Sequence, residues 1–419
     1  MNGLLKFITC GSVDDGKSTL IGHMLYDAKL IFTDQEKALK LDSKVGSREG
    51  KIDYSLLLDG LMAEREQGIT IDVAYRYFTT EKRSFIVADT PGHEEYTRNM
   101  AVGAAFADLA VILVDASQGV MIQTKRHARI CSLMGIRHFV IAVNKMDLVN
   151  YSKERFDKIK KQIRILLAEF EYDSVEIIPV SATEGDNITK PSRSMVWYKG
   201  KILLEYLEEI KVRQKDGTGF LMPVQRVVRP NHAFRGFQGQ IESGSVALGQ
   251  EITVLPGKEK AKIGRILRGD KDVEKAFSGW PVTLCTDREV DISRGCVLCR
   301  GELPMTGNMF EAKILWMEDS HLVAGKNYLL KLGTKTIPAT VMAIRCRIDV
   351  NTGEEIPADE IFKNEIAECE ISVGDTLVFD RFENTQVLGS LILIDRVSHM
   401  TAACGVVENA LNRSGNVIY

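Results

Sequence analysis

Residues 11–18 read Gly-Ser-Val-Asp-Asp-Gly-Lys-Ser. They follow the apolar run Leu4–Thr9, which we expect to form a strand, and they precede a stretch that we expect to form a helix. The segment therefore fits the pattern G-x-x-x-x-G-K-[ST] in the strand-to-helix context that this pattern requires. The alternative is a plain glycine-rich turn, which the flanking strand and helix disfavour.

This pattern has a direct physical use. Its glycines let the backbone curl so that amide groups point at phosphate oxygens, and the start of a helix favours an anion. Lys17 would reach the β- and γ-phosphates of a nucleotide, and the Ser18 hydroxyl would ligate Mg²⁺. The residues expected to surround the phosphates are Gly11, Ser12, Val13, Asp14, Asp15, Gly16, Lys17, Ser18 and Thr19.

A second motif, Asp89-Thr90-Pro91-Gly92-His93, ends another apolar run. An aspartate at a strand end, here Asp89, can hold the metal through its water shell. Gly92 would supply an amide where the backbone must approach the γ-phosphate closely. A lone histidine is more often structural, but His93 directly follows this motif, and we expect it to orient the attacking water.

A third motif, Asn144-Lys145-Met146-Asp147, also ends an expected strand. The Asp147 carboxylate can accept hydrogen bonds from the N1–H and N2 amino groups of guanine together, which adenine cannot supply. Alone, the tetrapeptide would fit a solvated turn. Its order after the first two motifs instead predicts a guanine site.

Two further segments complete the expected site. Ser181-Ala182 follows the expected strand Val175–Val180 and would supply a backbone contact to the guanine oxygen. Gly68-Ile69-Thr70 lies between the first two motifs, where a threonine can ligate Mg²⁺ and couple the order of its loop to the nucleotide state. A plain strand start is the alternative for this segment. The expected metal ligands are Ser18, Thr70 and Asp89.

The order of the apolar runs predicts the fold. Up to about residue 215, short apolar runs alternate with helix-period segments, which is typical of a mostly parallel sheet with helices on both faces. The expected strands are Leu4–Thr9, Ser84–Asp89, Leu109–Asp115, His138–Asn144 and Val175–Val180, and the expected helices are Lys153–Phe170 and Gly200–Ile210. Beyond the polar stretch Lys211–Gly219, short β-rich runs between glycine turns predict two small all-β barrels. We place the domains at residues 1–215, 216–307 and 308–419.

The composition agrees with several folded domains. A chain of 419 residues is too long for one hydrophobic core. The net charge of -3 gives no reason to expect nucleic acid as a partner. Eight scattered cysteines are expected to be buried free thiols, and Cys296-Val-Leu-Cys299 lacks the second pair that a zinc site would need. No apolar run approaches the roughly 20 residues that span a bilayer, so we expect no membrane contact and a cytoplasmic location.

With these motifs, the chain resembles the elongation factor Tu and factor 1-alpha group of GTPases. Within that group it looks most like the GTPase large subunit of bacterial sulfate adenylyltransferase, the ATP sulfurylase. Translation factors usually carry a histidine where Ser12 stands and a basic residue where Gln67 stands. The segments that carry the resemblance are residues 11–21, 59–78 and 89–100, together with Arg229-Pro-Asn, Phe234-Arg-Gly-Phe and Asp291-Ile-Ser-Arg-Gly.

The resemblance implies GTP and Mg²⁺ as cofactors and a small catalytic subunit as partner, in a heterodimer or larger assembly. That subunit joins ATP and sulfate into adenosine 5′-phosphosulfate and pyrophosphate, the first step of sulfate assimilation, and GTP hydrolysis drives the reaction. Family members commonly run past the point where this chain stops, so its C-terminal end is expected to be short. No second P-loop follows residue 215, so we expect no adenylylsulfate kinase activity. A tRNA-delivering translation factor and a regulatory switch without coupled chemistry stay open as alternatives.

Overall fold

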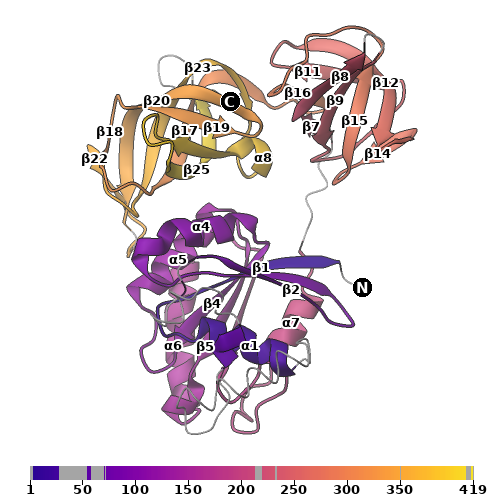
Figure 1. Ribbon diagram of the computed structural model, residues 1–419. Coiled ribbons are helices and arrows are strands. Elements are labelled where there is room, and N and C mark those ends of the chain that lie inside the picture. Colours follow the sequence, from indigo (N-terminus) through magenta and orange to yellow (C-terminus); the bar gives the residue numbers. More distant parts are fainter. Residues whose placement is uncertain are drawn as a thin grey trace. The chain divides into compact units, whose positions relative to one another are not determined.

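Six strands in the order β2-β3-β1-β4-β5-β6 form the sheet that carries the phosphate and base motifs. β3, β1, β4, β5 and β6 run parallel, while β2 lies antiparallel at one edge (Figure 1). Every residue of β4 and β5 is buried, as expected of central strands that helices cover on both faces. The strands are β1 (Leu4–Cys10), β2 (Ala74–Thr79), β3 (Ser84–Asp89), β4 (Leu109–Asp115), β5 (His138–Asn144) and β6 (Ser174–Pro179).

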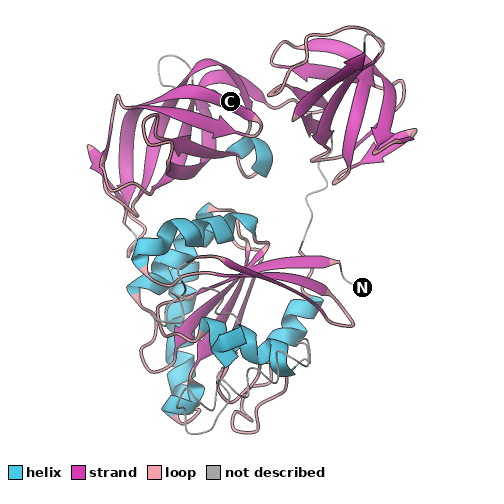
Figure 2. Ribbon diagram, viewed as in Figure 1, coloured by secondary structure: helices cyan, strands magenta, loops and turns pink. Residues whose placement is uncertain are grey.

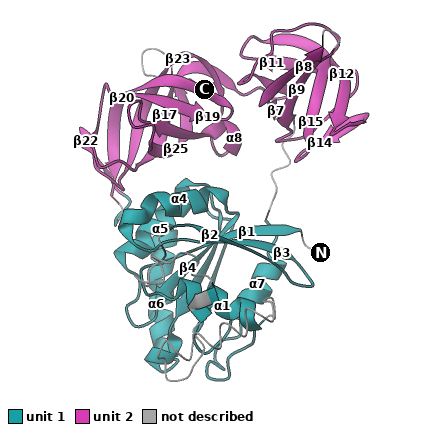
Figure 3. Cartoon of the chain, in the orientation of Figure 1, with its two compact units in different colours: residues 1–212, 350–353 teal, residues 213–349, 354–419 magenta. Residues whose placement is uncertain are grey.

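The structure is a computed structural model that describes residues 3–27, 54–57, 70, 72–212, 219–231, 234–349, 351–411 and 417–418. The chain divides into two compact units. Unit 1 is Met1–Val212 with Val350–Gly353, and unit 2 is Arg213–Asp349 with Glu354–Tyr419 (Figure 3). Each unit has its own buried core.

Helices lie on both sides of the unit 1 sheet (Figure 2). On one face, Phe7 and Val111 of the sheet pack with Leu20 of α1 and Leu203 of α7. On the other face, α4 contacts β1, and α5 contacts β4 and α4. The helices are α1 (Lys17–Asp27), α4 (Thr97–Phe106), α5 (Ile122–Leu133), α6 (Lys153–Leu167) and α7 (Leu203–Glu209), with the 3-10 helices η1 (Tyr54–Leu57), η2 (Glu94–Tyr96) and η3 (Met146–Val149).

The two expected helices are present but shorter than expected. α6 ends at Leu167, because the amides of Glu169 and Phe170 turn back to carbonyls three residues earlier and close the chain into a tight turn. α7 begins after Ile202, whose backbone is extended, and ends before Ile210. Apolar spacing continues past both helix ends, which is why the periodicity overestimates the length of the helices.

Unit 2 contains two eight-stranded antiparallel sheets. The first has the order β7-β16-β11-β12-β15-β9-β8, and its strand β7 also contacts β9. The second closes on itself, because β17 pairs with both β23 and β25. Separate apolar cores fill the two sheets, one around Phe237 and Leu284 and the other around Trp316 and Tyr328. The predicted fold class, an α/β domain followed by β barrels, is confirmed.

In the part of unit 2 that the structure describes, the elements are strands and one small helix. The strands of the first barrel are β7 (Phe220–Pro223), β8 (Arg226–Asn231), β9 (Phe234–Gln240), β10 (Ser245–Ala247), β11 (Glu251–Leu255), β12 (Glu259–Arg268), β13 (Lys271–Asp272), β14 (Lys275–Phe277), β15 (Pro281–Thr286) and β16 (Val297–Arg300). The elements of the second are β17 (Met305–Trp316), β18 (Leu322–Val323), β19 (Asn327–Leu332), β20 (Lys335–Ile348), β21 (Glu355–Ile356), β22 (Glu360–Ile361), β23 (Ile366–Phe379), α8 (Gln386–Gly389), β24 (Ser390–Ile394), β25 (Thr401–Leu411) and β26 (Val417–Ile418).

The cysteines are free thiols, as expected, and most are buried. Cys296 belongs to the core of the first barrel, whereas Cys299 belongs to a different apolar cluster with Val378 and Leu388. The two sulfurs therefore belong to different apolar cores. Among the described residues, no helix is both long and apolar enough to cross a membrane.

Candidate functional site

The glycine-rich loop lies where the sequence places it, between the end of β1 and the start of α1. Asp14 and Gly16 have φ angles of 65° and 88°, in the left-handed region, and these angles curl the loop back on itself. The Lys17 ammonium donates to the carbonyls of Gly11 and Ser12 at 3.1 and 2.8 Å. The loop thus wraps around the lysine that is predicted to reach the phosphates.

Two of the residues predicted to hold the metal, Ser18 at the start of α1 and Asp89 at the end of β3, lie within hydrogen-bond distance of each other. Ser18 Oγ donates to Asp89 Oδ2 at 2.9 Å, and Thr9 Oγ1 donates to Asp89 Oδ1 at 2.8 Å. Hydroxyl and carboxylate oxygens are the hard ligands that Mg²⁺ prefers, so this donor set fits the metal. Sequence reasoning brought Ser18 and Asp89 together correctly, but it missed the supporting hydroxyl of Thr9.

Charge is buried at the base of the loop. Lys17 is only 7% exposed, and burial lowers its pKa, although Asp89 and Asp15 act in the opposite direction. Burial raises the pKa of Asp15, whose carboxylate accepts from the Ser12 amide at 2.6 Å. A phosphate would supply Lys17 with additional negative charge in a place that solvent barely reaches.

Gly92 lies directly against the phosphate loop. A Cβ at this position would lie 2.5 Å from Gly11 O and 2.6 Å from Lys17 Nζ, so only glycine permits the contact. Thr90 holds the segment against β1, because its hydroxyl donates to Thr9 O at 2.7 Å. Gly92 therefore lies against the loop that is predicted to bind the phosphates, and its approach to the γ-phosphate stays a prediction.

His93, the predicted water-orienting residue, has a side chain that is 46% exposed. Its Nδ1 accepts from the Glu95 amide at 3.3 Å and so caps the short helix η2.

The remaining predicted contact residues lie in the same loops and helices: Val13 and Asp14 in the phosphate loop, Thr19 in α1, Pro91 before Gly92, and Met146 in η3.

Asn144 joins the base motif to the phosphate loop. Its Nδ2 donates to Asp15 O at 2.7 Å, and its Oδ1 accepts from the Ala182 amide at 2.8 Å. Ser181 Oγ donates to Asp147 Oδ1 at 2.7 Å, which holds the carboxylate predicted to read the base. The structure therefore brings the motifs that end β1, β5 and β6 into one site, as parallel strands require.

Lys145 stands in the same motif in a left-handed conformation, with a φ of 60°. Its ammonium donates to Asp115 Oδ2 at 2.8 Å. Burial acts to raise the pKa of Asp115, but hydrogen bonds from Lys145 and Ser117 outweigh it and lower the pKa overall. Sequence reasoning missed Asp115, although a carboxylate at the end of the fully apolar strand β4 was a signal for it.

The switch prediction lies mostly outside the described residues. Thr70 itself is described and half-buried, but Gly68, Ile69 and Gln67 are not among the described residues. The assignment of Thr70 as a metal ligand therefore stays a prediction.

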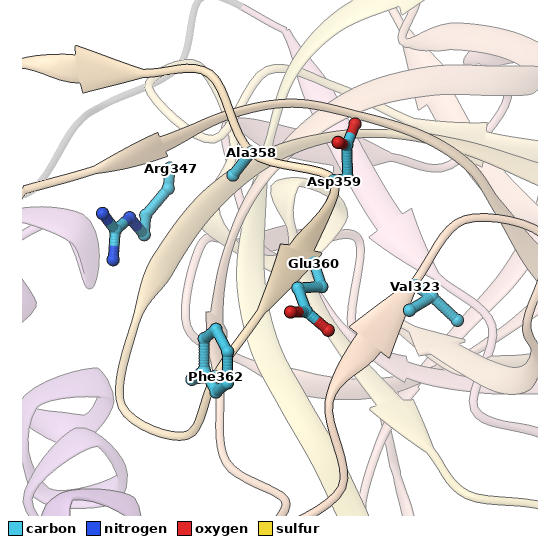
Figure 4. Close-up of a pocket in the computed structure, with 6 residues that line it drawn as sticks. All are labelled: Val323, Arg347, Ala358, Asp359, Glu360 and Phe362. Carbon is cyan, nitrogen blue, oxygen red and sulfur yellow. The ribbon is translucent and has the colours of Figure 1, made fainter.

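A cavity of about 440 Å³ lies in unit 2, which holds none of the three motifs. Figure 4 shows the residues that line it: Val323, Arg347, Ala358, Asp359, Glu360 and Phe362. Two of its charged residues have partners within the protein, since Arg347 lies 2.6 Å from Glu365 and Glu360 lies 3.2 Å from His321. The cavity has no part in the site described above.

Comparisons with known proteins agree with this geometry. The family model of the elongation factor Tu GTP binding domain matches residues 2–218, and that of the GTP-eEF1A C-terminal domain-like family matches residues 309–408. Sulfate adenylyltransferase subunit 1 of Methylorubrum extorquens is 49% identical over 414 residues, covering 98% of this chain and 88% of that protein.

Two further relatives give the same result. Sulfate adenylyltransferase subunit 1 of Colwellia psychrerythraea is 47% identical over 412 residues, covering 98% of this chain and 88% of that protein. The bifunctional enzyme CysN/CysC of Xylella fastidiosa is 49% identical over 417 residues, covering 99% of this chain and 67% of that protein. The resemblance drawn from the motifs is confirmed, and the chain belongs to the sulfate adenylyltransferase subunit 1 family of GTPases with an elongation factor Tu type GTP-binding domain.

Proposed function

We propose that this chain binds and hydrolyses GTP, and that the hydrolysis drives the formation of adenosine 5′-phosphosulfate and pyrophosphate from ATP and sulfate on a small partner subunit. The observation that carries the proposal is the bridge made by Asn144. Its side chain hydrogen-bonds to Ala182 at 2.8 Å and to Asp15 at 2.7 Å, which joins the loop predicted to contact the base to the loop predicted to bind the phosphates. Membership of the subunit 1 family supports the output.

Guanine is recognised at Asp147. Its carboxylate, which Ser181 holds, accepts from N1–H and the N2 amino group, and the loop that carries Ser181 and Ala182 offers a backbone amide to the oxygen on C6. Adenine offers neither the N1–H nor this oxygen, so the Asp147 carboxylate would receive no hydrogen bond from N1 of the base.

Hydrolysis takes place between the phosphate loop and Gly92. Lys17 and the loop amides bind the β- and γ-phosphates and stabilise charge on the transferring group, and Gly92 offers its amide to the γ-phosphate. Mg²⁺, held by Ser18, by Thr70 and by Asp89 through water, would add positive charge beside these oxygens. His93 holds the attacking water in line, and no covalent intermediate is needed.

The output lies on another chain. The relatives are named as one numbered subunit of an enzyme, which supports a heterodimer or larger assembly with a small catalytic subunit. The division into domains 1–215, 216–307 and 308–419 and a cytoplasmic location are part of the same proposal.

A turnover assay tests the proposal. GTP hydrolysis by this chain is measured alone, with the small subunit, and with the small subunit, ATP and sulfate, while adenosine 5′-phosphosulfate is measured in parallel. We expect hydrolysis to rise only in the full mixture and product to accumulate only when GTP is present. Replacing sulfate by chloride serves as the control.

The alternatives give different results in the same assay. Hydrolysis that ignores the full mixture but responds to ribosomes and tRNA would identify a translation factor. Hydrolysis that responds only to a protein activator, with no adenylyl transfer, would identify a regulatory switch. Either result would contradict the proposal.

A further inference from the structure

His23 lies on α1, the helix that begins with Lys17, and is only 5% exposed. Its ring stacks on Tyr54 with the ring centroids 4.1 Å apart and the planes 24° from parallel. On another side, Gly185 packs so closely that a Cβ there would lie 2.6 Å from His23 Nε2. Gly22 lets Tyr54 approach, since a Cβ at Gly22 would overlap the Tyr54 carbonyl. The imidazole is therefore held in one orientation.

That orientation aims one nitrogen at the loop after β6. His23 Nδ1 lies 2.6 Å from the carbonyl oxygen of Ala182. A carbonyl oxygen only accepts, so Nδ1 carries the hydrogen and donates it. Nε2 faces Asp27 Oδ1 at 3.8 Å. A residue of the phosphate-binding helix thus holds the backbone of the base-binding loop.

Ala182 is held from both sides. Its amide donates to Asn144 Oδ1 at 2.8 Å, while its carbonyl accepts from His23. Because a peptide unit is planar, fixing the direction of this carbonyl also fixes the direction of the amide that follows it. The neighbouring Ser181 donates to Asp147, so the same loop supports the carboxylate that reads the base.

We propose that His23 is a positioning residue for guanine recognition: its hydrogen bond to the Ala182 carbonyl orients the backbone amide of Thr183, in the same peptide unit, toward the oxygen on C6 of the base. The inference rests on the function proposed above, because it requires that the site bind a guanine nucleotide. It goes further by assigning the reading of one atom of the base to a side chain outside the three motifs.

Base analogues separate this role from a merely structural one. Affinities are measured for GDP, for 6-thio-GDP, in which a poorly accepting sulfur replaces the oxygen on C6, and for IDP, which lacks the N2 amino group. The first ratio, GDP over 6-thio-GDP, reports the contact to the C6 oxygen. The second, GDP over IDP, reports the contact to Asp147.

Matched variants complete the experiment. His23→Leu removes the donor at similar volume, whereas His23→Asn keeps a donor near the place of Nδ1. His138→Leu is the control. His138 is also buried in unit 1, at 7% exposure, and its Nδ1 lies 2.8 Å from Ser174 Oγ, at the opposite end of β6 from the loop that carries Ala182. If His23→Leu does not fold, His23→Gln takes its place. The glutamine amide lies one bond further from the backbone than His23 Nδ1, so this variant has no donor at the Nδ1 position.

We expect His23→Leu to lower the first ratio about tenfold, the effect of roughly one hydrogen bond, and to leave the second ratio unchanged. His23→Asn should restore much of the first ratio, and His138→Leu should change neither. A fall of both ratios together, no change in either, or the same loss in His138→Leu would overturn the inference. A parent protein that binds no GDP would overturn the proposed function and the inference with it, whereas normal GDP binding with an unchanged first ratio would overturn the inference alone.

Discussion

His93 is nearly half exposed and caps only its own short helix, so its replacement should disturb little of the fold. We expect His93→Ala to bind GDP like the parent protein and to hydrolyse GTP about 100-fold more slowly, because the attacking water loses its orientation. Single-turnover hydrolysis and GDP titration measure the two properties separately. His321→Ala, which alters an exposed histidine of unit 2, is the control. Equal rates in His93→Ala and the parent would remove the proposed role.

Asp147 should decide which base the site accepts. Asp147→Asn replaces an acceptor of two N–H groups by an amide that offers one acceptor and one donor, which suits the additional C2 oxygen of xanthine. We expect the preference to change from GTP toward XTP by about 100-fold or more, since a mismatched buried polar pair costs about 1–3 kcal/mol on each side. Competition binding with both nucleotides measures the change, and an unaltered preference would count against guanine recognition at this residue.

His127 on α5 should make the folded state sensitive to acid. Burial, with Lys17 and Arg126 nearby, lowers the pKa of His127 from its usual 6.5 to about 3. Below the unfolded value, the unfolded chain binds a proton that the folded chain does not, so stability falls as the pH falls from 6.5 toward 3. We expect a loss of about 2 kcal/mol between roughly pH 6.5 and pH 5 that is absent in His127→Leu. Urea unfolding of both proteins at the two pH values measures it, and equal losses in both would contradict this account.

At this scale, the sequence predicts residues whose chemistry is local and misses those that act through the fold. Lys17 and Asp147 stand in motifs whose residue spacing predicts their roles, a phosphate contact for Lys17 and a guanine contact for Asp147. Asp115 and His23 act through partners far along the chain, Lys145 and Ala182, and no local pattern announces such pairs. Only the order of the parallel strands brings them together.

Among the elements, α6 shows how an apolar stripe stabilises unit 1. Ile163 is 1% exposed, whereas Ile165 on the opposite side of the same helix is 72% exposed. We expect Ile163→Ala to lower the free energy of unfolding by about 2–5 kcal/mol, because it leaves a cavity. Ile165→Ala should change it by less than about 0.5 kcal/mol. Urea denaturation of the matched pair measures the difference, and similar losses in both would mean that α6 does not pack through this stripe.

The same helix shows what periodicity can predict. The three- and four-residue spacing of Phe156, Ile159 and Ile163 fixes the existence and the buried face of α6. Its end is set instead by backbone hydrogen bonds at Glu169 and Phe170. Those bonds depend on where the chain must turn toward β6, which apolar spacing does not encode.

On the scale of the whole molecule, the motifs lie in unit 1 and the barrels in unit 2, so a bound nucleotide should protect them differently. We expect GDP at about 100 times its dissociation constant to stabilise unit 1 by about 2.7 kcal/mol. Amide hydrogen exchange in β1, α1 and β5 should slow accordingly, while exchange in β23 of unit 2 should stay the same. ADP is the control and should have no effect. Protection that is confined to β23 would contradict a nucleotide site in unit 1.

The change from alternating elements to short β runs predicts the architecture, because layers follow from the order of strands and helices. It does not predict how the two barrels of unit 2 are joined. Leu221 and Val297 of the first barrel share a buried cluster with Val378 and Leu388 of the second. In the sequence, the apolar residues of this cluster look the same as those that fill the core of a single barrel. Only the folded structure shows that they pack between the two barrels.

The two hydrogen bonds of Asn144 have a consequence for anyone who redesigns the nucleotide specificity of this protein. Asn144 and Asp147 stand in one tetrapeptide, yet Asp147 is the residue proposed to contact the base, while the side-chain amide of Asn144 hydrogen-bonds to Asp15 and Ala182. In a library that varies the whole tetrapeptide, many variants would lose the hydrogen bonds of Asn144, so a change in base selectivity could not be separated from a loss of local structure. Varying Asp147 while Asn144 is kept constant should change the base preference and leave the two loops that Asn144 joins in place.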